Sequence, residues 1–182
     1  MSAAPAPDPV APLPLDVLVD ILDGLARAEG LWRPHVAHDP DERVRLRLLA
    51  TPAYEVWLLG WTPGQSVGLH DHGDANGAFV VVDGELTETS VVAGRLVDEA
   101  RTAGAIGRIP VGALHDVANR ATRNATSIHV YSHPLSAMGF YRPDGSLARV
   151  EAVHEQSTIL DPGIAPASTV RRLPPPGATI VP

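Results

Sequence analysis

GQSVGLHDH at residues 64–72 and GAIGRIPVGALHDVAN at residues 104–119 are the two segments of this sequence that say most about its fold. The first contains His70 and His72, whose side chains would share one face of an extended strand while Asp71 points the other way. The second contains His115, which can approach the same face from another strand. Three imidazoles that converge in this way occupy one side of a metal ion and leave its other positions open. A lone His-x-His pair predicts a metal site only weakly, but the two segments together predict one.

The composition limits what else the chain can bind. Its formal net charge is −7, which leaves no basic field for a nucleic acid backbone. It contains no cysteine, which excludes disulfides, thiolate ligands and a cysteine nucleophile and leaves 8 histidines as the main candidate ligands. No run approaches the roughly 20 apolar residues that cross a bilayer, and the N-terminus lacks a signal-peptide pattern. We therefore expect a cytoplasmic protein with neither nucleic acid nor membrane as a partner.

The hydrophobic pattern changes its period along the chain. Leucines at positions 15, 18, 22 and 25 recur at helical spacing and predict a helix over about residues 15–28. From Arg43 onward the period is two, and the apolar runs at 54–61 and 78–82 have the length of buried strands. Many short strands separated by Gly/Pro turns predict an all-β sandwich or barrel with the helix outside it. We expect a single domain over residues 15–160, a disordered Ala/Pro arm at 1–14 and an extended Pro-rich tail at 161–182.

The two histidine segments resemble the two signatures of the cupin superfamily. One signature is G-x5-H-x-H with a glycine downstream, here Gly84; the other is G-x5-P-x-G-x2-H-x3-N, which residues 104–119 match at every fixed position. The acidic ligand that usually follows the first histidine pair falls at Gly77 and is missing. The resemblance implies a cupin double-stranded β-helix, a small jelly-roll barrel with the metal inside and a short N-terminal helical segment.

Within the cupins, residues 43–153 resemble the cysteine dioxygenase type I family of thiol dioxygenases. The resemblance rests on WTPG at 61–64, DGELTE at 83–88, HDVAN at 115–119 and SIHVYSHP at 127–134. The last block is the most diagnostic, because generic cupins have no Ser-x-His-x-Tyr there. The resemblance implies a mononuclear Fe(II) site and a hydrogen-bonded relay beside it. The implied iron ligands are His70, His72 and His115, and the implied relay is Ser127, His129 and Tyr131.

Physical chemistry supports the relay independently of the family. Ser127, His129 and Tyr131 alternate in a strand, so all three would face the barrel interior. A serine hydroxyl can fix the tautomer of the imidazole, which then orients the phenol toward the substrate. The alternative is simple packing, but a polar trio on an inward face is costly unless its members are paired.

Two positions depart from the mammalian pattern of that family. The cysteine that crosslinks to the tyrosine falls at Gly77, so no thioether can form. The tyrosine two residues before the substrate-carboxylate arginine is absent. We expect Arg45 or Arg47 to bind the carboxylate, because a guanidinium fork matches a carboxylate with two hydrogen bonds. The alternative for each is a solvated charge on an edge strand, and Arg149 is the next candidate.

The favoured function is a thiol dioxygenase that uses O2 to oxidise L-cysteine to cysteine sulfinate. The substrate thiolate would supply the negatively charged ligand that a site of three neutral imidazoles does not contain. The alternatives are a dioxygenase for another small thiol, such as 3-mercaptopropionate, and a non-catalytic cupin that binds a metal or small ligand. A sugar isomerase cupin fits less well because the acidic ligand is missing. The ligand types leave Ni(II) and Zn(II) open, and the oligomeric state is not predicted. The remaining histidines lack ligand spacing and are expected to be ordinary polar residues: His35, His38, His133 and His154.

Overall fold

The computed structural model describes residues 11–153. The helical elements are α1 (Leu15–Arg27), α2 (Glu29–Trp32) and the 3-10 helix η1 (Arg33–His35). The strands are β1 (Val44–Ala50), β2 (Glu55–Trp61), β3 (Asn76–Asp83), β4 (Glu85–Val92), β5 (Arg95–Thr102), β6 (Ile106–Ile109), β7 (His115–Ala118), β8 (Ala125–Ser132), β9 (Ala137–Tyr141) and β10 (Leu147–Ala152). Within the described range no helix is long and apolar enough to cross a membrane.

The predicted terminal segments fall mainly outside the described residues. This holds for all of the Pro-rich tail at 161–182 and for residues 1–10 of the Ala/Pro arm. Near the end of that arm, the Leu13 N–H donates to Ser132 Oγ over 2.9 Å, and its carbonyl accepts from Asn76 Nδ2 over 3.0 Å. The chain is therefore attached to the barrel before α1 begins.

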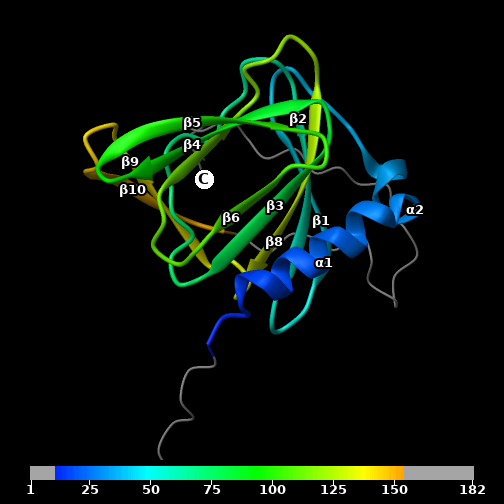
Figure 1. The fold of residues 1–182 in the computed structure, drawn as a ribbon, viewed down its shortest axis with the longest axis horizontal. Helices are drawn as coiled ribbons and strands as arrows, with labels where there is room; N and C mark the ends of the chain where they lie inside the picture. The colour runs from blue at the N-terminus through cyan, green and yellow to red at the C-terminus, as the bar shows by residue number, and fades with distance from the viewer. Residues whose placement is uncertain (1–10, 154–182) are drawn as a thin grey trace, which may run out of the picture.

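The strands form three antiparallel sheets that enclose a barrel (Figure 1). The five-stranded sheet has the order β1-β2-β8-β3-β6, the three-stranded sheet the order β5-β4-β7, and β9 pairs with β10. Single bridges from His70 to His115 and to Phe140 connect the segment between β2 and β3 with β7 and β9. The predicted fold class, an all-β barrel with an N-terminal helical segment, is confirmed.

The five-stranded sheet has one face against α1 and the other toward the barrel interior. Leu18 and Leu22 of α1 are fully buried and pack against the outer face. Burial of each such leucine stabilises the fold by about 1.5–3 kcal/mol, and Figure 1 shows the helix lying along this sheet. The outer-face residues in this cluster include Val56, Leu58, Ala78, Val80, Ile128 and Val130. The inner-face cluster includes Trp57, Leu59, Trp61, Phe79 and Val81, with Leu86, Ile109 and Val117 packed onto them.

Strand β8 is the centre of this arrangement, because every residue in it is buried. Ile128 and Val130 belong to the cluster that contacts α1. Alternation along the strand therefore turns Ser127, His129 and Tyr131 toward the interior. Their neighbours across the sheet are Leu59 and Val81 for Ser127, Trp57 and Phe79 for His129, and Glu55 and Gly77 for Tyr131.

Candidate metal centre and active site

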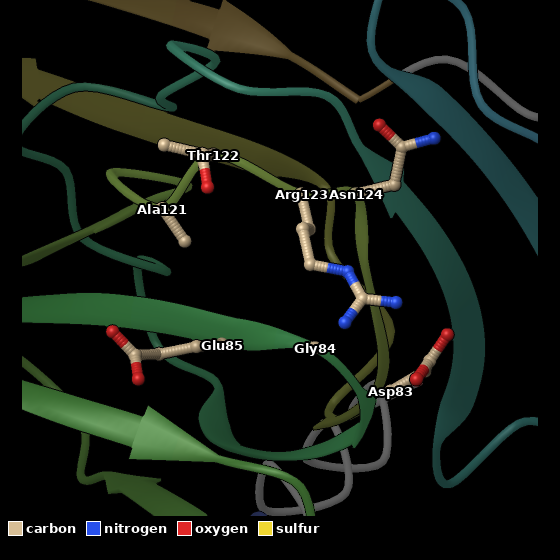
Figure 2. A pocket seen from close by; sticks show the side chains of 7 residues that line it. All are labelled: Asp83, Gly84, Glu85, Ala121, Thr122, Arg123 and Asn124. Carbon is tan, nitrogen blue, oxygen red and sulfur yellow. The ribbon is translucent and has the colours of Figure 1, made fainter.

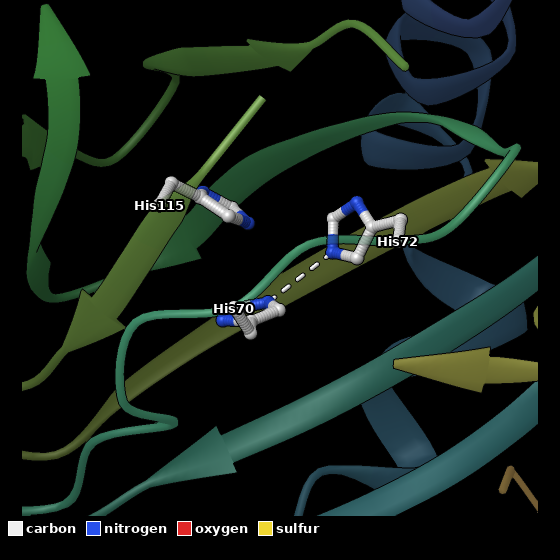
Figure 3. Close-up of side chains that lie close together, drawn as sticks. All are labelled: His70, His72 and His115. Atoms are coloured by element: carbon white, nitrogen blue, oxygen red, sulfur yellow. Dashed lines mark hydrogen bonds between the residues drawn. The ribbon is translucent and has the colours of Figure 1, made fainter. Parts of the chain in front are cut away.

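His70, His72 and His115 come together inside the barrel (Figure 3). One ligand atom from each lies within 4.8 Å of the others, and the three side chains are only 2–3% exposed. The histidine pair does not lie in a continuous strand, as the alternation argument assumed. His70 forms an isolated bridge, with its N–H 2.8 Å from the His115 carbonyl, and His72 lies in the loop that leads to β3.

The outer nitrogens of two of these rings have fixed partners. His70 Nδ1 lies 2.8 Å from the Gly68 carbonyl, and His115 Nδ1 lies 3.1 Å from Glu88 Oε1. Both partners are acceptors, so each Nδ1 donates a proton and each Nε2 keeps its lone pair. Nε2 of His115 is buried and has no hydrogen-bond partner among the described residues. A metal ion bound at the three inner nitrogens would satisfy this orphaned acceptor, so the residues fit a metal.

Burial also keeps His70 and His72 neutral. Burial, and then the charge of the neighbouring His115, lowers the pKa of His70 to about 3. Burial lowers the pKa of His72 well below its ordinary value, again helped by the other two histidines. Neutral imidazole is the form that binds a metal, so the site is ready to bind one at neutral pH.

Asp71 attaches the histidine loop to β9. Its Oδ2 accepts from the Tyr141 hydroxyl over 2.5 Å, and its Oδ1 accepts from the N–H groups of Gly73 and Gly139 over 3.1 Å each. Burial alone would raise the pKa of the Asp71 carboxyl, but these hydrogen bonds outweigh it and lower that pKa. The sequence indicated only that Asp71 points away from its neighbours, and the anchoring role depends on β9, which is distant in sequence.

Ser127, His129 and Tyr131 form a hydrogen-bonded chain with a fourth member, Trp61. Trp61 Nε1 lies 2.9 Å from Ser127 Oγ, which lies 2.8 Å from His129 Nε2. His129 Nδ1 lies 3.1 Å from the Tyr131 hydroxyl. The Tyr131 ring packs against His72, with ring centroids 4.7 Å apart, so the chain ends beside the histidine cluster.

The indole gives this chain a direction. Trp61 Nε1 can only donate, so Ser127 Oγ accepts from it. The hydroxyl's other hydrogen-bond partner among the described residues is His129 Nε2, so the serine proton is used when it donates to that nitrogen. His129 Nδ1 then carries the ring proton and donates to the Tyr131 oxygen. The Tyr131 hydroxyl proton remains available to a ligand in the cavity. Burial raises the pKa of Tyr131 and lowers that of His129 well below its ordinary value, so both groups stay neutral.

Gly77 lies directly opposite Tyr131 in the β3–β8 pair. A Cβ atom at this position would lie 2.9 Å from His72 Nδ1 and 3.2 Å from Tyr131 Cδ1. Gly77 stands at the position of the acidic ligand in the cupin signature and of the crosslinking cysteine in the mammalian pattern. Because it has no side chain, the space beside it is left to His72 and Tyr131.

The arginines of the β1 region differ in exposure and in their partners. Arg45 is exposed, whereas Arg47 is half-buried, lies 5.8 Å from the Trp57 ring centroid and pairs with Glu55 at 3.6 Å. Arg43, just before β1, is also half-buried: its guanidinium lies 4.8 Å from the Trp61 ring centroid, and its Nε is inaccessible to solvent without a partner among the described residues. Burial, and then the charge of Arg45, lowers the pKa of Arg43 to about 10, which still leaves it charged at neutral pH.

Arg43 was not among the expected anchors, although the period of two that begins there places it on the same face as Arg45 and Arg47. Arg149, the next candidate, lies over the Phe140 ring at 4.0 Å and pairs with Glu151 on the exposed strand β10. Of the other histidines, His38 bonds the Ala125 carbonyl and Thr126 Oγ1, and His154 lies outside the described residues.

A separate concave region lies where the β3–β4 turn meets the loop before β8 (Figure 2). It contains none of the predicted site residues. Its lining is mostly polar and consists of Asp83, Gly84, Glu85, Ala121, Thr122, Arg123 and Asn124.

Comparison with known proteins agrees with this geometry. TT1209 from Thermus thermophilus superimposes with a TM-score of 0.52 at 18% identity, over 56% of this chain and 93% of that one. An uncharacterised Klebsiella pneumoniae protein with a double-stranded β-helix domain gives a TM-score of 0.51 at 20% identity, over 64% and 93%. These similarities establish the cupin fold. The family model for cysteine dioxygenase type I matches residues 15–143, well over half of the chain. The chain therefore belongs to the cysteine dioxygenase type I family.

Proposed function

We propose that this protein is a mononuclear non-heme Fe(II) thiol dioxygenase that oxidises L-cysteine to cysteine sulfinate. The observation that supports this most is the cluster of three buried histidines, which contains no carboxylate among the described residues. A metal bound there keeps its full positive charge, and a substrate thiolate supplies the missing anion. The reaction is RSH + O2 → RSO2H, in which sulfur loses four electrons and dioxygen accepts them.

His70, His72 and His115 would hold the iron. When bound, the iron would favour the thiolate over the thiol and hold the substrate sulfur beside dioxygen. The cluster is buried inside the barrel, which limits competing reactions with water.

Tyr131 would donate its hydroxyl proton to the reacting oxygen or to the substrate. The chain from Trp61 through Ser127 and His129 leaves that proton free, and the raised pKa of Tyr131 keeps it on the phenol. Such a donor matters most if its hydrogen bond strengthens as negative charge develops on the oxygen. The Phe79 ring, stacked on His129 with centroids 5.0 Å apart, holds the imidazole plane in place.

We place the substrate carboxylate on Arg43, ahead of the expected Arg45 and Arg47. The Arg43 guanidinium packs over Trp61, the first member of the relay, and its charge lowers the pKa of His129 after burial and His115. Arg47 already faces Glu55, and Arg45 is exposed. A guanidinium fixed in plane by an aromatic ring is well suited to bind a carboxylate with two hydrogen bonds.

A thiol carboxylate without an amino group, such as 3-mercaptopropionate, is the second candidate substrate. Two buried carboxylates near the site are already paired, Glu55 with Arg47 and Glu88 with Arg101. Neither is free to bind a substrate ammonium group, whereas the Arg43 guanidinium favours an anion.

Oxygen uptake after anaerobic loading with Fe(II) tests the proposed function. L-Cysteine, 3-mercaptopropionate and 2-aminoethanethiol, which has no carboxylate, are compared at equal concentrations. We expect one O2 consumed per thiol, a sulfinic acid product from one or both carboxylates, and little turnover of 2-aminoethanethiol. A protein that binds one Fe(II) but consumes no oxygen with any of these thiols would instead be a metal-binding cupin without this activity.

A further inference from the structure

Glu88 on β4 is a buried carboxylate that the proposed chemistry does not use. Its side chain is almost fully buried and lies between the metal centre and the outer edge of the barrel. Oε1 faces His115 Nδ1 at 3.1 Å, and Oε2 accepts from Arg101 Nε at 3.0 Å and Nη2 at 2.8 Å. Arg101 comes from β5, the exposed edge strand of the three-stranded sheet, where it also pairs with Glu99.

We propose that Glu88 is the positioning carboxylate of the metal centre, which acts on the bound ion through His115. This rests on the proposed function only in requiring a metal at the three histidines, and it holds for any thiol substrate. Glu88 would do two things: fix the ring proton of His115 on Nδ1, and place a negative charge one imidazole away from the ion.

The register of the sheet explains how Glu88 reaches this histidine. β4 pairs with β7 so that Glu88 lies opposite Val117, while His115 lies opposite Ser90. Glu88 and His115 are therefore diagonal neighbours, a separation that long side chains can bridge. The carboxylate binds the nitrogen that faces away from the cluster, so it cannot occupy a coordination position.

The charge balance of the centre favours the same role. The usual acidic ligand position is Gly77, and the cluster of candidate ligands among the described residues consists of three histidines without a carboxylate. A carboxylate bound to the far nitrogen makes the imidazole a stronger ligand, and loss of such a partner typically weakens metal binding by about 10–100-fold. Glu88 thus strengthens metal binding while the open positions remain available to thiolate and dioxygen.

A structural ion pair with Arg101 is the competing explanation, and three variants separate the two. E88Q keeps the shape of the side chain and an acceptor oxygen but removes the charge. R101Q removes the ion pair and keeps the Glu88–His115 hydrogen bond. E99Q removes the other, exposed partner of Arg101 and is the matched control.

The first measurement is the Kd for Zn(II), used as a redox-inert probe, by competition with a chromophoric chelator. We expect Kd to rise by about 10–100-fold in E88Q, much less in R101Q, and not at all in E99Q. Thermal melting of the metal-free proteins checks that each variant folds. An unchanged Kd in a folded E88Q, or equal losses in E88Q and R101Q, would overturn the proposal.

The second measurement needs neither metal nor turnover. In protein with 15N-labelled histidine, NMR identifies which nitrogen of His115 carries the proton. We expect the Nδ1–H tautomer in the parent and in R101Q, and loss of that preference in a fourth variant, E88L, which removes the acceptor oxygen as well as the charge. A His115 tautomer that is the same in parent and E88L would also overturn the proposal. Neither result depends on thiol oxidation, so failure here is distinct from failure of the proposed function.

Discussion

Replacement of Arg43 by methionine tests the proposed carboxylate anchor directly. The substitution keeps an unbranched apolar stem over Trp61, where the guanidinium now lies 4.8 Å from the ring centroid, and removes the charged fork. Because the pKa of Arg43 is about 10, the group is almost fully charged at neutral pH. A hydrogen bond to a charged partner contributes about 1.5–3 kcal/mol, which corresponds to roughly 10–150-fold in affinity.

The assay is the KM for L-cysteine in Fe(II)-loaded enzyme, followed by oxygen uptake. We expect R43M to raise KM by about 10–150-fold. An exposed charge contributes only about 0–1 kcal/mol, so R45M should change KM by less than about five-fold. R95M, on the exposed strand β5, is the matched control and should behave as the parent. Activity toward 2-aminoethanethiol, which has no carboxylate, should be equally low in all four proteins.

An R43M enzyme with the parent KM for L-cysteine would refute the assignment. If R45M shows the large effect instead, the exposed Arg45 is the anchor, and the half-buried Arg43 serves the packing of Trp61. Melting curves separate the two explanations further, because a packing role predicts a loss of thermal stability in R43M without a selective effect on carboxylate substrates.

Four more outcomes follow from the site. H72A should lose most of its iron by metal analysis, and full occupancy would contradict the ligand assignment. Y131F should keep its iron and its fold but lose about 10²–10³-fold in turnover. H129A should lose a comparable amount. The double variant should lose little more than either single variant, because the effects of substitutions within one hydrogen-bonded unit are not additive. G77A should bind Zn(II) more weakly than the parent, since its Cβ would lie 2.9 Å from His72 Nδ1; an unchanged Kd would mean that His72 moves without cost. The metal-free protein should lose stability as pH falls below about 6.5. The pKa of His70 is about 3 in the folded protein and about 6.5 in the unfolded chain, so the unfolded chain binds more protons between these two values. A melting temperature that stays constant from about pH 7 to about pH 4 would contradict this.

Local patterns were sufficient to predict the fold class and the clustering of the three histidines. The spacing of His70 and His72, with His115 in a second motif, predicted the cluster, although the continuous strand assumed for His70 and His72 is not present. The alternation of Ser127, His129 and Tyr131 predicted that their side chains would share a face, because a single strand fixes that relation. Each of these inferences depends on residues close together in sequence.

The features that were missed depend on contacts between distant segments. Glu88 meets His115 because β4 and β7 pair in one register, and Trp61 meets Ser127 because β2 and β8 do. His70 and His72 converge although they lie in an irregular segment, since Asp71 binds β9 and His70 bridges to His115. No short window of sequence contains both partners of any of these contacts.

Three imidazoles of the site share one feature: a hydrogen bond at one ring nitrogen determines which of the two nitrogens carries the proton. The Gly68 carbonyl fixes His70, Glu88 fixes His115, and Ser127 fixes His129.

His72 is the exception, because its Nδ1 is buried without a hydrogen-bond partner among the described residues. Packing beside Tyr131 and Gly77 positions this ring, together with the 3.2 Å contact between its Nε2 and Nε2 of His70 (Figure 3). The absence of a side chain at position 77 thus has two consequences. A metal held by the three histidines would have no protein carboxylate as a ligand, which would leave a place for an anionic substrate. The missing side chain also gives His72 the room to reach the other two histidines.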